Sequence, residues 1–297
     1  MGAYGRLKLR VDYCIVVLSI KGVSCCQVLT PLDHASPALI TLAIVTVMAT
    51  ILITGANRGI GFAIAQAVCD SFPTSTVLIG CRDVDLGEQA IKRLRFDGVT
   101  ASLHTLPLDI ESDASIAAAA TIVDEKFGKL DILINNAIKL DSSSPTQLEE
   151  LRRTMNSNFN NAVASNIIVT RAFIPLLRRA SWPRVIMISS TRGSIQKTAN
   201  KELPPVASID YCVVKAALNM FTVHLQAAEH VANEDNKITF WVANPGHCKT
   251  GFNGFRGHKD PLEGAEVVLR LLKSERGDIQ EGTFWEFEDG KFRQVPW

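Results

Sequence analysis

The chain has 297 residues, of which 47% are hydrophobic, so it is long enough for one large globular domain or two small ones. A formal net charge of +1 gives no electrostatic reason to expect a nucleic-acid or membrane-surface partner, and we predict neither. The cysteines are odd in number and lack the paired C-x-x-C spacing of a metal site. We therefore predict reduced thiols in a cytoplasmic protein without a structural metal; they are Cys14, Cys25, Cys26, Cys69, Cys81, Cys212 and Cys248.

Residues 39–53 form a strongly apolar run that allows two interpretations, a membrane span or a buried strand. The run leads directly into a glycine-rich turn, and a strand buried in a sheet cannot also lie in a bilayer. Asp12 interrupts the apolar patch near the start of the chain, which argues against a signal peptide. We predict that residues 1–47 are an extension outside the fold and that residues 48–297 form a single domain.

From residue 50 onward, strand and helix patterns alternate, which is typical of a parallel sheet wrapped by helices. We expect strands at 51–54, 76–80, 101–106, 130–134, 184–189, 238–243 and 283–288. We expect helices at 59–70, 86–96, 112–127, 147–179 (as one or two segments), 211–233 and 261–274. The sequence therefore predicts an α/β fold, with a Rossmann-type doubly wound parallel sheet of about seven strands and helices on both faces.

A glycine-rich turn lies between the first expected strand and the first expected helix, with the spacing G-x-x-x-G-x-G. Glycines let a backbone turn tightly and approach a pyrophosphate, which binds at the N-terminus of the following helix. The glycines alone would indicate only a turn, but the flanking strand and helix favour dinucleotide binding. The candidate cofactor-binding residues of this turn are Gly55, Asn57, Arg58, Gly59, Ile60 and Gly61.

Arg82 and Asp83 follow the second expected strand, where side chains distinguish the two nicotinamide cofactors. An acidic residue there binds the ribose 2′-hydroxyl of NAD, whereas an arginine accommodates the 2′-phosphate of NADP. Arg82 comes first and Arg58 supplies a second cation, so we predict NADP(H). The alternative is that both arginines are solvated and that Asp83 holds the ribose.

Three further candidates follow later strands. Asp109 could hydrogen-bond the adenine amino group, although an isolated aspartate is more often a loop or capping residue. Asn135 and Asn136 end the fourth strand, at the edge of the sheet where ligands bind in α/β folds. Thr250 follows a Pro-Gly turn and could reach the carboxamide or a phosphate of the cofactor.

Tyr211 and Lys215 are four residues apart in an expected helix, so their side chains share one face. The pKa of a free tyrosine is about 10, which is too high for efficient proton transfer near neutral pH, and a nearby cation lowers it. The pair is a weak motif by itself. Upstream, Ser189 and Ser190 end the fifth strand, where a hydroxyl could steady a substrate carbonyl or simply form a turn.

Together these residues resemble the short-chain dehydrogenase/reductase family, in its one-domain branch, over residues 50–297. The markers occur in the family's order: the glycine-rich turn, Asp109, Asn-Asn-Ala, Ser190, Tyr211 with Lys215, and Pro-Gly followed by Thr250. The residues after the second strand and Glu-Gly-Ala at 263–265 resemble NADPH-dependent carbonyl reductases. The C-terminal end resembles fungal members.

The resemblance implies a role for each matching residue. Tyr211 is the general acid that protonates the carbonyl oxygen, and Lys215 lowers the pKa of Tyr211 and holds the nicotinamide ribose. Ser190 is preferred over Ser189 because it satisfies the family pattern Ser-x-x-Gly. Asn136 helps to seat the ribose region, while the hydride itself comes from the cofactor. Family members are often homodimers or homotetramers, through helices near 150–179 and 211–233.

Two positions depart from the family pattern. Ile138 replaces the glycine that usually follows Asn-Asn-Ala, in the loop over the nicotinamide. Ala162 stands where the family has its fourth catalytic residue, an asparagine. Asn160 and Asn161 lie next to Ala162, so one interpretation is that the alignment of this helix with the family is shifted by one residue. The alternative is that backbone groups alone hold the proton-relay water. The segment 194–210 is longer than in the shortest members and is expected to border the substrate pocket.

The sequence thus predicts an NADPH-dependent oxidoreductase that transfers a hydride between nicotinamide and a small-molecule ketone, aldehyde or secondary alcohol. Two alternatives remain. One is a non-catalytic dinucleotide-binding sensor or scaffold, which Ile138 and Ala162 favour. The other is an epimerase or dehydratase that uses the same cleft, since a fold does not fix a function.

Overall fold

The computed structural model describes residues 14–20, 23–29, 48–141, 146–205 and 208–297. The chain divides into two compact units, Met1–Met48 and Ala49–Trp297. In the first unit, β1 (Cys14–Ile20) pairs antiparallel with β2 (Val23–Leu29). That residues 1–47 are dispensable for the fold of the second unit stays a prediction, and residues 39–47 of the apolar run lie outside the described residues.

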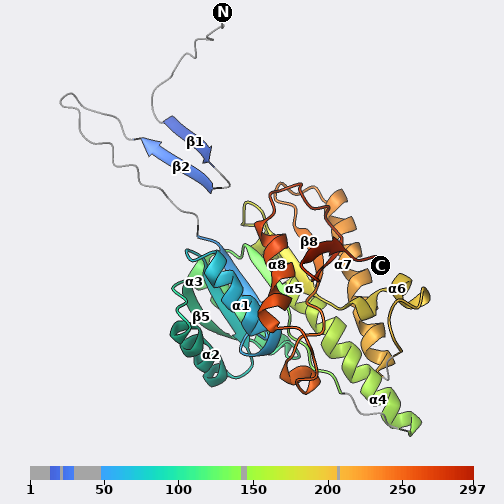
Figure 1. The fold of residues 1–297 in the computed structure, drawn as a ribbon. Helices are drawn as coiled ribbons and strands as arrows, with labels where there is room; N and C mark the ends of the chain where they lie inside the picture. Colours follow the sequence, from blue (N-terminus) through green and yellow to red (C-terminus); the bar gives the residue numbers. More distant parts are fainter. Residues whose placement is uncertain (1–13, 21–22, 30–47, 142–145, 206–207) are drawn as a thin grey trace, which may run out of the picture. The chain divides into compact units, whose positions relative to one another are not determined.

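The second unit contains one eight-stranded sheet with the order β10-β9-β8-β7-β6-β3-β4-β5 (Figure 1). Every neighbouring pair is parallel except β9 and β10. The chain winds outward from β3 first in one direction and then, from β6, in the other. The strands are β3 (Thr50–Thr54), β4 (Thr76–Cys81), β5 (Ser102–Pro107), β6 (Ile132–Asn135), β7 (Arg184–Ile188), β8 (Thr239–Asn244), β9 (Phe284–Glu288) and β10 (Lys291–Gln294).

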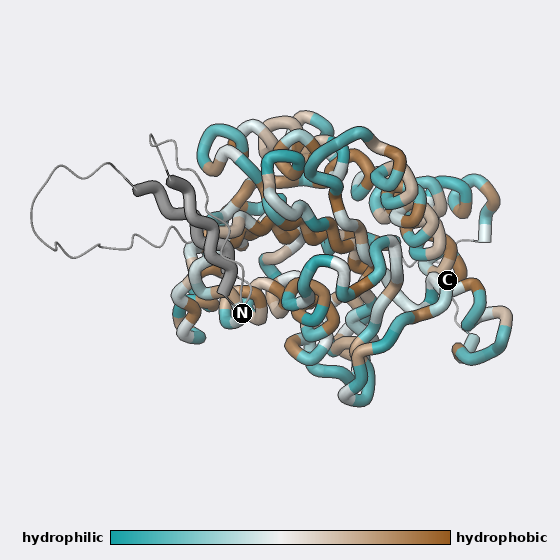
Figure 2. Tube along the Cα trace, turned by 90° about the horizontal axis from the view of Figure 1, so that it is seen from above, coloured by the Kyte–Doolittle hydropathy of each residue, from teal (hydrophilic) through white to brown (hydrophobic). Residues whose placement is uncertain are grey.

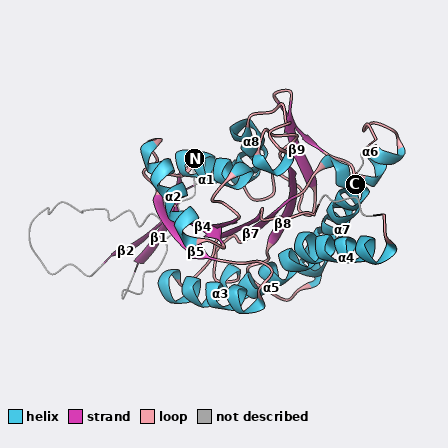
Figure 3. Ribbon diagram, turned by 90° about the horizontal axis from the view of Figure 1, so that it is seen from below, coloured by secondary structure: helices cyan, strands magenta, loops and turns pink. Residues whose placement is uncertain are grey.

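Helices cover both faces of this sheet (Figure 3). One layer contains α1 (Gly59–Ser71), α2 (Val84–Phe96) and α8 (Pro261–Lys273). The other contains α3 (Asp113–Phe127), α4 (Leu148–Phe159), a π-helical turn η1 (Asn160–Ala164), α5 (Ser165–Leu177) and α7 (Ile209–Val231). Three short helices lie between the main elements: η2 (Thr191–Gly193), α6 (Ile195–Ala199) and η3 (Gly251–Asn253).

The central strands are buried on both faces, which explains their unbroken apolar sequences. Every residue of β3, β4, β6 and β8 is buried. Successive side chains of β3 point to opposite faces: Ile51 and Ile53 pack in the cluster under α1 and α8, and Leu52 packs in the cluster under α3 and α5. Figure 2 shows the hydrophobic segments running through the interior of this unit.

The predicted fold class is confirmed, with one more strand than expected. The eighth strand, β10, forms a hairpin with β9, and Asp289 and Gly290 at its tip both have positive φ angles, of 52° and 70°. Two such residues form the tight turn that suits a two-residue hairpin loop. Asp-Gly is the sequence signal for this turn, but β10 itself is polar and largely exposed, so no apolar alternation marks it.

Candidate active site

The glycine-rich turn joins β3 to α1 at the carboxyl edge of the sheet, next to the point where the winding direction changes. Gly55 and Gly59 have positive φ angles of 65° and 59°, which glycine adopts without strain. A Cβ on residue 61 would overlap the carbonyl oxygen of Gly55, so the helix can approach the turn this closely only with glycine there. The side chains of Asn57 and Ile60 are half-buried in the same turn.

Asn136 holds the glycine-rich turn in place. Its Nδ2 donates to the backbone oxygen of Thr54 at 2.8 Å and to that of Gly55 at 3.3 Å. In return, the Thr54 hydroxyl accepts hydrogen bonds from the backbone N–H groups of Asn136 and Ala137, both at 2.9 Å. The structure therefore gives Asn136 a role in shaping the turn, which the sequence did not reveal. Thr54 is a further residue of the site that sequence reasoning missed.

The two arginines predicted to bind the adenosine end of the cofactor lie in the turns that lead into α1 and α2. Arg58 and Arg82 are both exposed, and neither forms an ion pair within the described part of the chain. Asp83 caps α2, because its carboxylate accepts a hydrogen bond from the backbone N–H of Leu86 at 3.1 Å. Arg82 is thus the open charged group after β4, while Asp83 has a structural task.

Asp109 and Thr250 reach the same edge of the sheet from two other loops. Asp109 is half-buried after β5, and one of its carboxylate oxygens accepts from the backbone N–H of Glu111 at 3.1 Å. Thr250 is buried beside the start of α1: a Cβ on residue 59 would be 3.7 Å from the Thr250 Cβ. Both lie in loops at the carboxyl ends of parallel strands, where the cofactor was expected.

Tyr211 and Ser190 are brought together by close packing of η2 against α7. A Cβ on residue 193 would lie 2.7 Å from the backbone carbon of Lys215, so glycine at this position lets the serine loop approach the helix. A hydrogen bond links the Ser190 and Tyr211 side chains. Ser189 points elsewhere, since its hydroxyl donates to Asn219 Oδ1 at 2.6 Å in the core. The geometry therefore favours Ser190 over Ser189 as the functional hydroxyl.

Burial dominates the electrostatics of the Tyr211 and Lys215 pair. It raises the pKa of the Tyr211 phenol, against the hydrogen bond with Ser190 and the positive charge of Arg192. It lowers the pKa of the Lys215 ammonium to about 7. Lys215 Nζ donates to the backbone oxygen of Ile188 at 2.7 Å. That Lys215 lowers the Tyr211 pKa stays a prediction, since burial sets the upward direction of the Tyr211 pKa shift in this structure.

The π-helical turn η1 bears on the choice left open at Ala162. The backbone N–H of Ser165 donates to the oxygen of Asn160, five residues earlier, so the turn holds one residue more than an α-helical turn. Asn161 is buried, and its Oδ1 accepts from the backbone N–H of Lys139 at 2.5 Å. Ala162 packs instead in an apolar cluster that Ile138 also contacts. The structure thus favours the slipped register, with Asn161 as the polar residue that faces the loop after β6.

The segment 194–210 is anchored to the C-terminal residues. The Ser194 hydroxyl donates to the backbone oxygen of Pro296 at 2.6 Å, and the backbone N–H of Gln196 donates to that of Trp297 at 2.8 Å. Arg192 donates to the backbone oxygen of Pro204. Residues 206–207 lie outside the described part. Its last two residues begin α7, the helix that carries Tyr211, and that the segment borders the substrate pocket stays a prediction.

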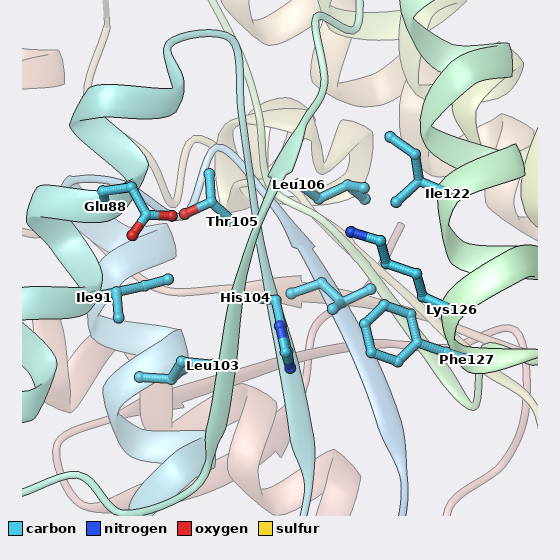
Figure 4. Close-up of a pocket in the computed structure, with 10 residues that line it drawn as sticks. Glu88, Ile91, Leu103, His104, Thr105, Leu106, Ile122, Lys126 and Phe127 are labelled. Carbon is cyan, nitrogen blue, oxygen red and sulfur yellow. The ribbon is translucent and has the colours of Figure 1, made fainter.

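A cavity of about 230 Å³ lies away from these residues, around the outer strand β5 between α2 and α3 (Figure 4). None of the residues predicted for the site lines it, and we assign it no role. Within the described residues, no group of three or more His, Cys, Asp or Glu side chains could hold a metal ion. No described helix has the length and apolarity needed to cross a membrane.

Comparisons with known proteins agree with the geometry. Residues 49–260 match the model of the short chain dehydrogenase family. A short-chain dehydrogenase/reductase of Aspergillus fumigatus is 38% identical over 259 residues, which cover 83% of this chain and 97% of the relative. Carbonyl reductase 1 (NADPH) of Sus scrofa is 37% identical over 284 residues, which cover 83% and 93%. The crystal structure of NADPH-bound carbonyl reductase from chicken fatty liver is 28% identical, covers 84% of this chain and 99% of its own, and has a TM-score of 0.70.

Proposed function

The chain belongs to the short-chain dehydrogenase/reductase family of oxidoreductases, and we propose that it uses NADPH to transfer a hydride between nicotinamide and a ketone, aldehyde or secondary alcohol. The observation that carries the proposal is the meeting of Ser190, Tyr211 and Lys215 at the carboxyl edge of the sheet, beside the glycine-rich turn. We propose that a dinucleotide binds at this turn with its pyrophosphate at the N-terminus of α1, since Gly55 and Gly59 have positive φ angles and Gly61 lets the helix approach the turn closely.

The family binds a nicotinamide dinucleotide, and we propose NADP(H) as the form used here. The open guanidinium groups of Arg58 and Arg82 supply charge for a 2′-phosphate, whereas Asp83 is engaged in capping α2. Similar proteins named or solved with NADPH support this choice. The residues proposed to hold the cofactor are Gly55, Asn57, Arg58, Gly59, Ile60, Gly61, Arg82, Asp109, Asn136, Tyr211, Lys215 and Thr250.

Each residue of the chemical centre has a proposed task, while the bound cofactor supplies the hydride. Tyr211 gives its phenolic proton to the carbonyl oxygen during reduction and takes it back during oxidation. Ser190 donates a hydrogen bond to the same oxygen. Lys215 binds the ribose hydroxyls of the nicotinamide in this proposal. Asn161 holds the backbone of the loop after β6 through Lys139 and takes the position of the family's fourth catalytic residue.

The non-catalytic alternative is weaker than it was from sequence. Ile138 and Ala162 favoured it, and we propose that Asn161, whose Oδ1 accepts from the backbone N–H of Lys139, serves in place of the asparagine expected at Ala162. Homodimers or homotetramers remain a proposal for the assembly. Exposed apolar side chains on α4 and α7 are compatible with contacts between copies; they are Leu148, Leu151, Met155, Phe159, Val213 and Met220.

A direct test is to follow the absorbance of NADPH and of NADH with the full chain and a panel of ketones, aldehydes and quinones. We expect turnover with NADPH preferred.

In Tyr211→Phe we expect an NADPH dissociation constant close to that of the wild type and a turnover number lower by about 10²- to 10⁴-fold, because only the proton donor is lost. Unchanged turnover would remove Tyr211 from the mechanism. Tight NADPH binding without turnover on any substrate would favour the sensor or scaffold. Product formation without net NADPH consumption would favour an epimerase or dehydratase.

A further inference from the structure

Two aromatic side chains are held at the surface by an ordered loop after Thr250. Phe252 and Phe255 are 56% and 64% exposed. Asn253 fixes the loop, since its Nδ2 donates to the backbone oxygen of Cys248 at 2.8 Å and its side chain takes part in a capping box with Thr250. Phe255 has a positive φ of 61°, a conformation that is costly for an aromatic residue. A strained loop that keeps large apolar rings in solvent points to a use for at least one of them.

The two rings differ in what they face. The Phe252 ring centroid is 6.3 Å from that of Tyr211, with the ring planes at 50°. The Phe255 ring lies back on its own loop: its Cζ is 3.8 Å from the place of a Cβ on residue 251. Only Phe252 is therefore an immediate neighbour of the candidate proton donor, and Phe255 is a matched aromatic residue a few positions away.

We propose that Phe252 is a specificity-determining residue that selects carbonyl compounds with an aromatic ring bonded directly to the carbonyl carbon. The inference rests on the proposed function, which requires the carbonyl oxygen to lie within hydrogen-bond distance of the Tyr211 hydroxyl. One substituent of that carbonyl is then placed beside the ring next to Tyr211. The exposed part of the Phe252 ring is available to that substituent.

Aromatic geometry favours an aryl substituent over an alkyl one at this place. Aromatic rings prefer offset or edge-to-face contacts with centroids 4.5–7 Å apart, and such pairs are stronger than their buried area alone implies. An aryl ketone is planar through conjugation, so its ring keeps a fixed direction relative to the carbonyl group. A saturated ring of the same carbon count gains the area contact with Phe252 but not the aromatic pairing.

The test compares acetophenone with cyclohexyl methyl ketone, which have the same carbon skeleton. Dissociation constants are measured by calorimetry on the full chain saturated with NADP⁺, so that no hydride can be transferred, and kcat/KM is measured with NADPH. We expect the wild type to prefer acetophenone. In Phe252→Leu, which keeps an apolar side chain, we expect the preference to fall by about 2- to 10-fold in both measurements. In Phe255→Leu we expect the preference to be retained.

The outcomes separate the two proposals. An unchanged ratio in Phe252→Leu, an equal fall in Phe255→Leu, or a wild type without aryl preference in binding would overturn the role of Phe252. A wild type that turns over no member of the carbonyl panel but binds acetophenone more tightly, with that preference lost in Phe252→Leu, would overturn the proposed reductase activity and support the aromatic site.

Discussion

At the level of single residues, two adjacent serines have different surroundings, which give one a proposed catalytic role and the other a structural role. Ser189 donates to Asn219 Oδ1 at 2.6 Å in the buried core, whereas Ser190 hydrogen-bonds Tyr211. Both serines follow β7, which ends at Ile188, and Ser190 leads into η2 while Ser189 stays in the core, so the two side chains have different neighbours. The sequence alone left both available, and the Ser-x-x-Gly pattern chose the one that the geometry favours.

The serine pair gives a matched prediction. Ser190→Ala is expected to lower kcat by about 10²-fold, because it removes a donor to the developing oxyanion. Its unfolding free energy should fall by only about 0.5–1 kcal/mol, because the Ser190 hydroxyl also accepts from the backbone N–H of Arg192 at the start of η2. Ser189→Ala should instead lose about 1–3 kcal/mol, because Asn219 Oδ1 is left without its buried donor. Urea denaturation and steady-state kinetics on both variants check this, and a reversal of the two patterns would contradict the assignment.

Lys215 is expected to make the stability of the nucleotide-free protein depend on pH. Burial lowers its pKa from 10.5 to about 7. Below pH 7 the ammonium is charged in both folded and unfolded states, and the cost of its burial is fully present. As the pH rises above 7 the folded state loses the proton first, so stability increases by at most about 1.4 kcal/mol per pH unit.

The pH range in which stability rises ends where the ionisation of cysteines begins to lower stability. Burial raises the pKa of Cys69 and Cys248 to about 12, so these thiols lower stability once unfolded cysteine ionises, above about pH 8.5. We therefore expect the urea midpoint to rise between pH 7 and about pH 8.5. In Lys215→Met this rise should be smaller, whatever its absolute stability. Equal slopes in the two proteins would show that Lys215 does not titrate in this range.

At the level of secondary-structure elements, the π-helical turn η1 brings Asn161, and not Ala162, to the backbone of the loop after β6. Sequence alignment on the downstream helix placed Ala162 at the position of the expected asparagine, because it assumed an uninterrupted α-helical register. The i to i+5 bond between Ser165 and Asn160 adds one residue and brings Asn161 to the loop after β6. Apolar periodicity carries no signal for a single wide turn, so the sequence could pose these alternatives but could not choose between them.

This register predicts different effects for two neighbouring asparagines. Asn161→Ala is expected to lower kcat by about 10- to 100-fold while the NADPH dissociation constant stays near the wild-type value, because the loop at Lys139 loses its anchor. Asn160→Ala is the control, since Asn160 is exposed. Loss of activity in the Asn160 variant alone would place the functional asparagine one residue earlier. Wild-type activity in both variants would show that neither asparagine side chain is needed to anchor the loop after β6.

For the whole molecule, alternation of apolar runs with amphipathic segments was enough to predict a doubly wound sheet, because parallel strands buried on both faces leave a strong pattern. The strand β10 had no such pattern, since it is short and largely exposed. Candidate site residues could be predicted where the expected chemistry needs one particular residue type, as with Tyr211 and the glycines. The role of Asn136 was not, because it depends on two backbone oxygens, of Thr54 and Gly55, that only the folded chain brings near it.

The division of the chain at Met48 leads to the last prediction. Residues 49–297 form one compact unit that contains the sheet, both helical layers and every residue proposed for the site. We expect a chain that begins at Met48 to match the full chain in NADPH dissociation constant, kcat and urea midpoint, because β3 begins only at Thr50. A second variant that begins at Leu52 is the control, since it removes the Thr50 N–H bond to Asp131 and two of the five residues of β3, and we expect it not to fold. A clear loss of stability or cofactor affinity in the chain from Met48 would show that the preceding residues contribute to the domain.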